Sequence, residues 1–349
     1  MKPLTGVRIL DFTRLLPGPF ATYWLAGLGA EVVKVEDKKL GDYAKYMGVI
    51  RNKVSLPYAI LNFNKEIVFA DPDLDQDKSK IIEEIKKANV LIESFRPDTM
   101  KKWGLDYVSV KKLNPKLIYC SLTGFGQTGP LKNKAGHDIN YLALTGVLDQ
   151  TGESQTPSLS NLQFADIAGG SLPAIIGITS ALYAQEKWGK GCFIDCSIFD
   201  CTFALNPILL SHFNNQQEIQ RGQDLLTGAH PGYSVYQTRN SKFVALGALE
   251  KKFWESFCRC IEHPEWIDQI DHPKNWPELK LKLQREFKQY DLEHWASISE
   301  KHDFCLTPVL TFKESCQSEQ VRERGLLINQ VHPTENELTV FEIPLKFIE

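Results

Sequence analysis

A strand, helix, strand unit at the N-terminus constrains the fold of this chain most. Residues 7–12 form a short apolar run typical of a buried strand, residues 20–28 are compatible with a helix, and residues 31–36 read as a second strand. Gly29 suits the position just past the end of that helix. Because such units build parallel sheets with right-handed crossovers, we predict an α/β fold that begins like a Rossmann fold.

Later apolar runs predict further strands, and the sequence pattern changes after residue 232. Residues 67–70, 90–92 and 117–122 are candidate strands, and residues 192–199 read as a last strand entering a helix. From Tyr233 a hairpin-like pair precedes segments of helical periodicity. A chain of 349 residues also exceeds what one core usually serves. We predict a large Rossmann-like domain with a parallel sheet (1–210), a connection and smaller α+β domain (211–325), and a C-terminal return to the large domain (326–349).

The turn after the first strand argues against a nicotinamide dinucleotide. Dinucleotide sites use Gly-x-Gly-x-x-Gly there, so that backbone N–H groups can approach the pyrophosphate. This chain instead has Pro17, Gly18 and Pro19, and the two prolines carry no N–H. We therefore expect no NAD, although Glu36 ends the second strand with a carboxylate.

Charge and cysteine content favour an enzyme that acts on a small molecule. The net charge is -3, and no block of like charge suggests a nucleic-acid or membrane partner. No run approaches the roughly 18 apolar residues of a membrane span, and no signal-peptide core opens the chain, so we expect a cytoplasmic protein. Cys192, Cys196 and Cys201 are the only close trio, but a strand followed by a helix would scatter their sulfurs. We expect reduced thiols and no metal.

Two groups able to transfer protons stand near the ends of the stretch from 135 to 170. His137 lies in Gly-His-Asp-Ile-Asn-Tyr, and Asp166 lies in Phe-Ala-Asp-Ile-Ala-Gly-Gly. We predict that they meet across an active site, although spacing alone also fits a structural histidine and a helix-capping aspartate. Residues 169–183 have the pattern of a buried helix, which would place Gly169 and Gly170 near its N-terminus. Exposed N–H groups there could bind an oxyanion.

Two other stretches are candidate ligand contacts. Arg96 lies in the turn after the strand at 90–92, where open α/β sheets bind ligands, although a solvated surface arginine fits the spacing equally well. Gly124 and Gly126 punctuate the loop 123–130. A ligand could therefore lie against bare backbone in this loop.

Nine segments together carry a family resemblance. They are 3–11, 17–22, 28–36, 41–42, 95–97, 121–130, 136–141, 165–170 and 247–250. In order and spacing they resemble the family III CoA-transferase and α-methylacyl-CoA racemase superfamily, and the racemase-like branch most of all. The resemblance implies a large domain built from both chain ends, and an interlocked homodimer with coenzyme A between subunits. It implies no tightly bound cofactor, because coenzyme A is part of the acyl-CoA thioester substrate.

The resemblance also implies roles for individual residues. Asp166 matches the reactive carboxylate, which attacks the acyl-CoA carbonyl in the transferases and moves protons in the racemases. His137 matches the second acid/base group of the racemases, and Glu250 matches the carboxylate that orients this histidine. Asp138 is expected to be structural or to support the same network. An imidazole has a reference pKa of about 6.5, whereas an aspartate at about 3.9 needs burial to become a useful acid.

The leading prediction is therefore an epimerase acting on the α-carbon of a 2-methylacyl-CoA, with a CoA-transferase as the alternative. The predicted coenzyme A contacts are Arg14, Arg96, Gly124 and Gly126. Two departures from the family pattern keep a third possibility open, a protein that binds coenzyme A without catalysis. Residues 54–65 replace a Lys/Arg-Ser-Val-Ala-Leu-Asp-Leu-Lys segment, and Asp98 replaces a glycine beside Arg96.

Overall fold

The computed structural model describes residues 1–332 and 336–348, which form two compact units. Unit 1 comprises Met1–Val147, Ser160–Pro207 and Glu319–Glu349, and unit 2 comprises Leu148–Leu159 and Ile208–Ser318. Unit 1 is thus assembled from three segments of the chain. The domain boundaries predicted after residues 210 and 325 stay predictions.

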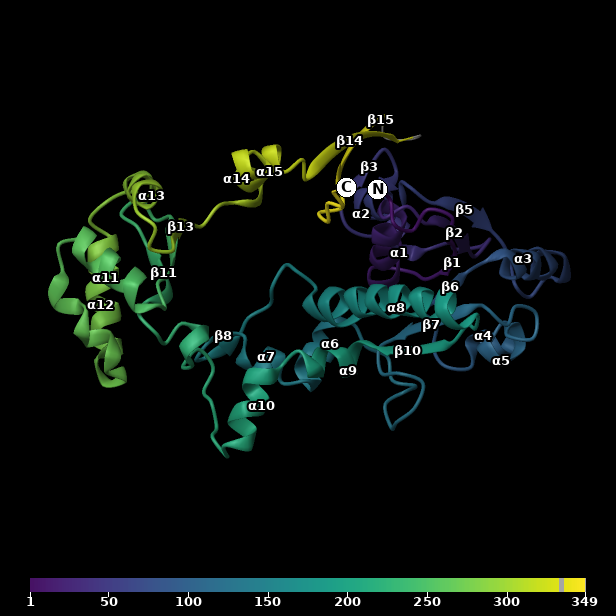
Figure 1. The fold of residues 1–349 in the computed structure, drawn as a ribbon, viewed down its shortest axis with the longest axis horizontal. Coiled ribbons are helices and arrows are strands. Elements are labelled where there is room, and N and C mark those ends of the chain that lie inside the picture. The colour runs from purple at the N-terminus through teal and green to yellow at the C-terminus, as the bar shows by residue number, and fades with distance from the viewer. Residues whose placement is uncertain (333–335, 349) are drawn as a thin grey trace. The chain divides into compact units, whose positions relative to one another are not determined.

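A six-stranded parallel sheet organises unit 1, which confirms the predicted sheet (Figure 1). β1 lies inside the sheet, with β2 and β5 on one side and β6, β7 and β10 on the other. The winding therefore reverses between β1 and β6, and parallel sheets of this kind bind ligands beyond the strand ends at such a point. In spatial order the strands are β10 (Phe193–Ser197), β7 (Ile118–Thr123), β6 (Val90–Glu93), β1 (Arg8–Phe12), β2 (Glu31–Glu36) and β5 (Glu66–Phe69).

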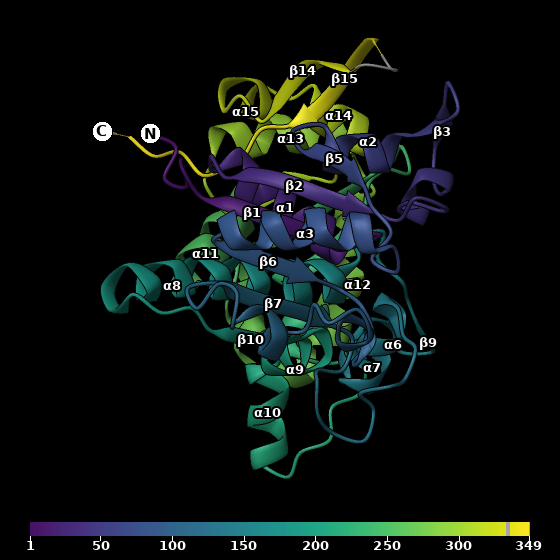
Figure 2. The ribbon, with the colours of Figure 1, turned by 90° about the vertical axis from the view of Figure 1, so that its right-hand side faces the viewer.

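Helices cover both faces of this sheet, because side chains alternate along each strand. Leu10 and Phe12 of β1 belong to the apolar core that includes Ile81 and Ile85 of α3 (Asp75–Lys87), which Figure 2 shows in front of β1 and β6. Asp11 points to the opposite face, where its carboxylate accepts a hydrogen bond from Thr22 of α1 (Pro17–Gly27). On that face α8 (Leu172–Trp188) packs against α1, β7 and β10.

The remaining elements of unit 1 are short. Residues from both ends of the chain meet there: Ile343 packs with Tyr23 and Leu28, and Leu338 and Val340 pack with Ala59. The elements are η1 (Tyr43–Tyr46), β3 (Ile50–Arg51), β4 (Val54–Ser55), α2 (Leu56–Asn62), α4 (Thr99–Lys102), α5 (Tyr107–Val110), α6 (Asp138–Leu144), η2 (Ala165–Ser171), α9 (Ile198–Ala204), α15 (Glu319–Glu323), β14 (Leu327–His332) and β15 (Asn336–Phe341).

Unit 2 combines a three-stranded antiparallel sheet with helices around an aromatic core. Trp254, Phe257, Phe287 and Trp295 are almost completely buried there. Its sheet runs β11 (Tyr233–Gln237), β12 (Phe243–Gly247), β13 (Leu306–Pro308), and its longer helices are α11 (Lys251–Cys260), α12 (Trp276–Phe287), α13 (Leu292–Lys301) and α14 (Phe312–Cys316). Shorter pieces are β8 (Gly152–Glu153), β9 (Thr156–Pro157), η3 (Leu225–Thr227), η4 (Pro264–Trp266), η5 (Asp268–Asp271) and η6 (Pro273–Asn275), while α7 (Val147–Gln150) and α10 (Pro207–Asn214) begin at the last residues of unit 1.

One helical segment corrects an expectation from the sequence. η2 and α8 are continuous from Ala165 to Trp188, and an 18-residue window of this segment has a mean hydropathy of 1.5. By length and composition it could cross a membrane, so the expectation that no run is long and apolar enough was wrong. In the structure the segment packs on β7 and β10, and 33% of the window is buried.

Candidate active site

A cavity of about 900 Å³ opens in unit 1 beyond the carboxyl ends of β1, β6 and β7. Its position is the reversal point of the sheet, where α/β proteins bind ligands. Apolar and aromatic side chains form much of the wall, and charged groups converge on it. The lining includes residues 14–17, 94–97, 122–125 and 134–138, together with Tyr43, Tyr58, Lys132, Tyr141, Gln163, Asp166 and Ile198.

Asp166 lies on η2, a π-helical turn that leads into α8. Turns of this kind are rare and occur often at functional sites. The backbone N–H of Asp166 donates to Asp138 Oδ1 at 3.0 Å, which ties η2 to the start of α6. Burial, and then the negative charge of Asp138, raises the pKa of Asp166 to about 7. Asp166 is therefore a carboxyl group that can both lose and gain a proton near neutral pH.

His137 is held on the same cavity wall by the N-terminus of α6. Its backbone N–H donates to Asn140 Oδ1 at 3.0 Å, and its carbonyl accepts from the Asn140 N–H at 2.8 Å. Tyr141 donates its hydroxyl proton to the Gly136 carbonyl at 2.8 Å, which anchors the preceding residue. His137, Asp138 and Asp166 thus line one cavity, and that His137 and Asp166 meet across an active site stays a prediction.

Cationic groups line other parts of the cavity. Arg14 and Arg96, both predicted as ligand contacts, are part of the lining, and so are Lys132 and Lys134. The two lysines were missed from the sequence, although they stand just before the stretch 135–170 that was singled out. Four cations on one cavity favour an anionic ligand.

The two predicted loop glycines have different surroundings. Gly124 lines the cavity, and a Cβ atom there would overlap the Tyr141 ring and hydroxyl. Gly126 has φ +77 and packs against Asp195 and Ser197, and it is not among the lining residues. Of these two glycines, only Gly124 is among the residues that line the cavity.

Gly169 and Gly170 are not where the sequence predicted them. Both are buried within η2, and a Cβ atom on Gly169 would overlap Thr202 of α9. The expectation that a helix begins at these glycines was wrong, because the π-helical turn extends the helix back to Ala165. Neither glycine is among the residues that line the cavity, so the geometry gives no support to oxyanion donors there.

Glu250 lies in unit 2 and precedes the first residue of α11. Its predicted role in orienting His137 stays a prediction. Among the described residues, no group of three or more His, Cys, Asp or Glu side chains could hold a metal ion.

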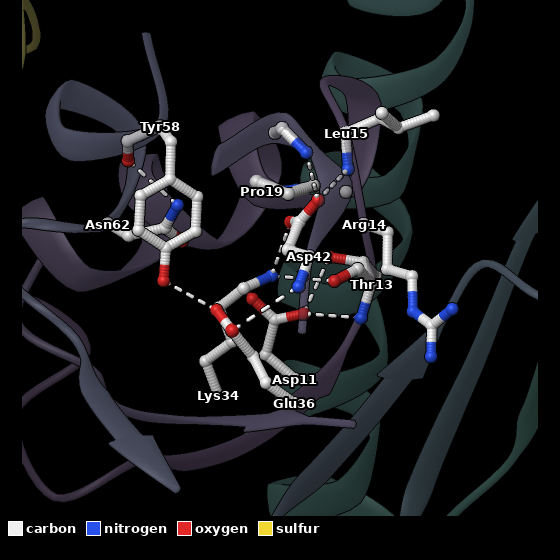
Figure 3. Close-up of polar contacts among 12 residues, drawn as sticks. Asp11, Thr13, Arg14, Leu15, Pro19, Lys34, Glu36, Asp42, Tyr58 and Asn62 are labelled. Carbon is white, nitrogen blue, oxygen red and sulfur yellow. Dashed lines mark hydrogen bonds and ion pairs between the residues drawn. The ribbon is translucent and has the colours of Figure 1, made fainter. Parts of the chain in front are cut away.

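Glu36, the acidic residue that ends β2, is used inside the protein. Its carboxylate accepts from the Tyr58 hydroxyl at 2.5 Å and from the Asp42 N–H at 3.3 Å (Figure 3). It also accepts from the Lys45 ammonium at 2.5 Å. The residue is 3% exposed. A carboxylate with these partners is not available to a ribose, which agrees with the absence of the dinucleotide glycine motif.

Comparison with known proteins places the chain among acyl-CoA enzymes. Residues 4–349 match the family described as CoA-transferase family III. Alpha-methylacyl-CoA racemase of Homo sapiens is 35% identical over 93% of this chain and 82% of its own length. Acetyl-CoA:oxalate CoA-transferase of Acetobacter aceti is 31% identical over 93% and 85%. The crystal structure of a CAIB/BAIF family protein from Brucella suis superposes with a TM-score of 0.86 at 27% identity, covering 99% of this chain and 92% of that one.

Proposed function

Because the chain belongs to CoA-transferase family III, we propose that it is an acyl-CoA epimerase that inverts the α-carbon of a 2-methylacyl-CoA thioester. One observation carries the proposal: Asp166, with a pKa of about 7, and His137 line the same cavity. Epimerisation needs two groups that exchange protons near working pH.

The reaction divides into two proton transfers. The thioester carbonyl acidifies the α-carbon, and the Asp166 carboxylate removes the α-proton from one face. The C–H electron pair moves into an enolate, whose oxygen carries the negative charge. His137, as imidazolium, then delivers its proton to the opposite face, and the carbonyl re-forms. In the reverse direction His137 acts as the base and Asp166 as the acid.

The cationic residues suit the coenzyme A part of this substrate. Arg14, Arg96, Lys132 and Lys134 supply donors for phosphate groups on a cavity that also contains the acid/base pair. No tightly bound cofactor enters the proposal, since coenzyme A arrives with the acyl group. We further propose a homodimer, because Ile176 and Tyr183 of α8 are exposed seven residues apart, on one helix face.

A CoA-transferase is the second candidate, supported by relatives of that activity at 31 to 35% identity. In that reaction the Asp166 carboxylate attacks the thioester carbonyl and expels coenzyme A as a thiolate, leaving a mixed anhydride. The thiolate then attacks the aspartyl carbonyl, which releases the first carboxylate and leaves an aspartyl thioester. A second carboxylate takes over the coenzyme A by the reverse steps. Burial that raises the pKa of Asp166 also makes its carboxylate more nucleophilic.

Deuterium exchange in D₂O separates the two reactions. The epimerase is expected to exchange the α-proton of both epimers of 2-methylacyl-CoA and to interconvert them. His137→Gln should lower interconversion by roughly 10² to 10⁴, yet still exchange deuterium into the epimer whose proton faces Asp166. His294→Gln, a change of the same kind in α13 of unit 2, should have no effect.

An unexchanged α-proton with the wild-type protein would contradict the epimerase. The transferase instead predicts that incubation with acyl-CoA and then hydroxylamine labels Asp166 as a hydroxamate, detected by peptide mass spectrometry. Asp166→Asn abolishes that label.

A further inference from the structure

The backbone that carries Arg14 is held by an unusual set of buried charges. β1 ends at Phe12, and two residues after Thr13 the chain adopts φ +65 at Leu15. This left-handed conformation is costly for a residue with a branched side chain, and it persists only where neighbouring groups fix it. Arg14 therefore sits in a short segment whose conformation depends on its surroundings.

Three hydrogen bonds fix that segment. Lys34 donates from Nζ to the Thr13 carbonyl at 2.6 Å, and the Leu15 N–H donates to Asp42 Oδ1 at 3.0 Å. The Arg14 N–H donates to Ser94 Oγ at 3.2 Å. The Thr13 carbonyl and the N–H groups of Arg14 and Leu15 thus each have a partner.

Lys34 and Asp42 form one buried unit. Lys34 Nζ lies 3.1 Å from Asp42 Oδ2, and both side chains are 0% exposed. Asp42 Oδ1 also accepts from the Ala44 N–H at 3.0 Å, at the start of η1. The two charges neutralise each other, so the unit holds the backbone on both sides of Arg14 without compensating the charge of the Arg14 guanidinium.

The Arg14 guanidinium points away from this unit, as Figure 3 shows. Its central carbon lies 5.0 Å from the ring centre of Phe95 and 5.6 Å from that of Tyr43, and all three residues line the cavity. Within residues 1–332 and 336–348 the structure gives it no salt bridge to a carboxylate. Aromatic faces leave the N–H edge of a guanidinium free, and that edge is the part that binds phosphate.

We propose that Asp42, together with Lys34, is a positioning residue that presents Arg14 to a phosphate group of coenzyme A. This inference rests on the proposed function and deepens it. Asp42 acts through the Leu15 N–H and touches no substrate atom. When the charged Asp42 acceptor is weakened or the Leu15 N–H is removed, Leu15 relaxes toward negative φ, and the direction of Arg14 changes with it.

Calorimetric binding of coenzyme A to the full-length protein tests the proposal. Asp42→Asn is expected to weaken the Kd about tenfold, because the amide removes the charge that pairs with Lys34 and leaves the Leu15 N–H with a neutral acceptor in place of a charged one. Arg14→Gln should weaken it at least as much. In the Arg14→Gln background, Asp42→Asn should change the Kd less than about twofold, because both act through one contact.

Asp37→Asn is the matched control. The pKa of Asp37 is lowered mainly by the Leu40 N–H and also by the charge of Arg14, so this carboxylate acts on Arg14 without bonding to Leu15. Its removal takes away the same negative charge and should leave the Kd unchanged or slightly tighter. A loss of affinity equal to that of Asp42→Asn would overturn the proposal.

A second variant tests the same hydrogen bond if Asp42→Asn does not fold. Leucic acid, introduced at position 15 by nonsense suppression, replaces the amide bond between residues 14 and 15 with an ester. This change removes the backbone N–H that donates to Asp42 and leaves every side chain in place. It should reproduce the Arg14-dependent loss. Equal losses with and without Arg14, or no loss in a folded variant, overturn the positioning role. A wild-type protein that does not bind coenzyme A overturns the proposed function itself.

Discussion

At the scale of single residues, the contact between Asp138 and Asp166 matters most for chemistry. Asp138 accepts a hydrogen bond from the backbone N–H of Asp166. Its negative charge also contributes part of the raised pKa of Asp166. Burial is the larger cause, so the raised pKa does not depend on Asp138 alone. Asp138 therefore adjusts a proton affinity that the fold itself establishes.

Asp138→Asn should shift the pH dependence of the reaction that Asp166 starts as a base. The asparagine keeps an oxygen that can accept the Asp166 N–H but removes the charge, so the pKa of Asp166 falls from about 7 while staying above its usual value. Because the carboxylate is the active form, kcat/KM for that direction should rise through its midpoint at lower pH than in the wild type. A pH profile of deuterium exchange measures this, and an unmoved midpoint would show that Asp138 does not act on Asp166 electrostatically.

The sequence could predict which residues line the cavity only where a motif or a strand end marks them. Arg14 and Gly124 reach the cavity because they follow strands that the apolar pattern located, whereas His137 and Asp166 were singled out by motifs that resemble the family. Lys34 and Asp42 were beyond such reasoning, since a lysine in an apolar strand gives no sign that its ammonium will meet a carboxylate from a later loop. That pairing depends on the convergence of strand ends in space.

At the scale of elements, η2 is a closely packed turn whose geometry sets Asp166. Gly169 has no room for a side chain, because an added Cβ would overlap Thr202 Oγ1 and lie 3.1 Å from the Ile198 carbonyl. Thr202 Oγ1 is itself buried without a hydrogen-bond partner. The contact between η2 and α9 is therefore one of shape, and not of polar bonding.

Gly169→Ala should destabilise the protein by about 1 to 3 kcal/mol and lower activity, because the added methyl group displaces η2. Adding Thr202→Ala to Gly169→Ala should restore part of the stability and part of the activity. It removes the overlapping hydroxyl, which has no hydrogen-bond partner to lose. Gly177→Ala in α8 is the matched control: its Cβ would lie 3.3 Å from an Ile194 methyl group, and helix propensity favours alanine. Urea unfolding at one pH compares the wild type with these three variants, and equal losses of stability at Gly169 and Gly177 would refute the packing explanation.

Strand boundaries followed from the sequence more closely than helix boundaries. The strand expected at 31–36 is β2, and that at 90–92 is β6 with one more residue, because short runs rich in valine, isoleucine and leucine mark buried parallel strands. The helix expected at 169–183 extends from Ala165 to Trp188. Its start depends on distant contacts, such as the hydrogen bond from Ser171 Oγ to the Pro17 carbonyl, which no local pattern reveals.

At the scale of the whole molecule, the proposed dimer should be visible in sedimentation velocity as a species of twice the chain mass. Ile176→Glu should shift it toward monomer, because a charge would be placed on the apolar face of α8. Val108→Glu on α5 is the control, since Val108 is 67% exposed against 64% for Ile176. A wild-type monomer at micromolar concentration, or equal effects of the two variants, would contradict an interface on α8.

The three-segment construction of unit 1 has a consequence for how the protein is made. The Tyr23 hydroxyl donates to the Phe341 carbonyl across a separation of 318 residues, and synthesis at about 5 to 20 residues per second leaves roughly 15 to 60 s between the two. During that interval α1 has emerged from the ribosome while the segment that covers it has not been translated. Unit 2, which ends at Ser318, is complete first. The nascent N-terminal region therefore exposes an apolar surface, which chaperones can bind, until the C-terminal residues have been translated and pack against it.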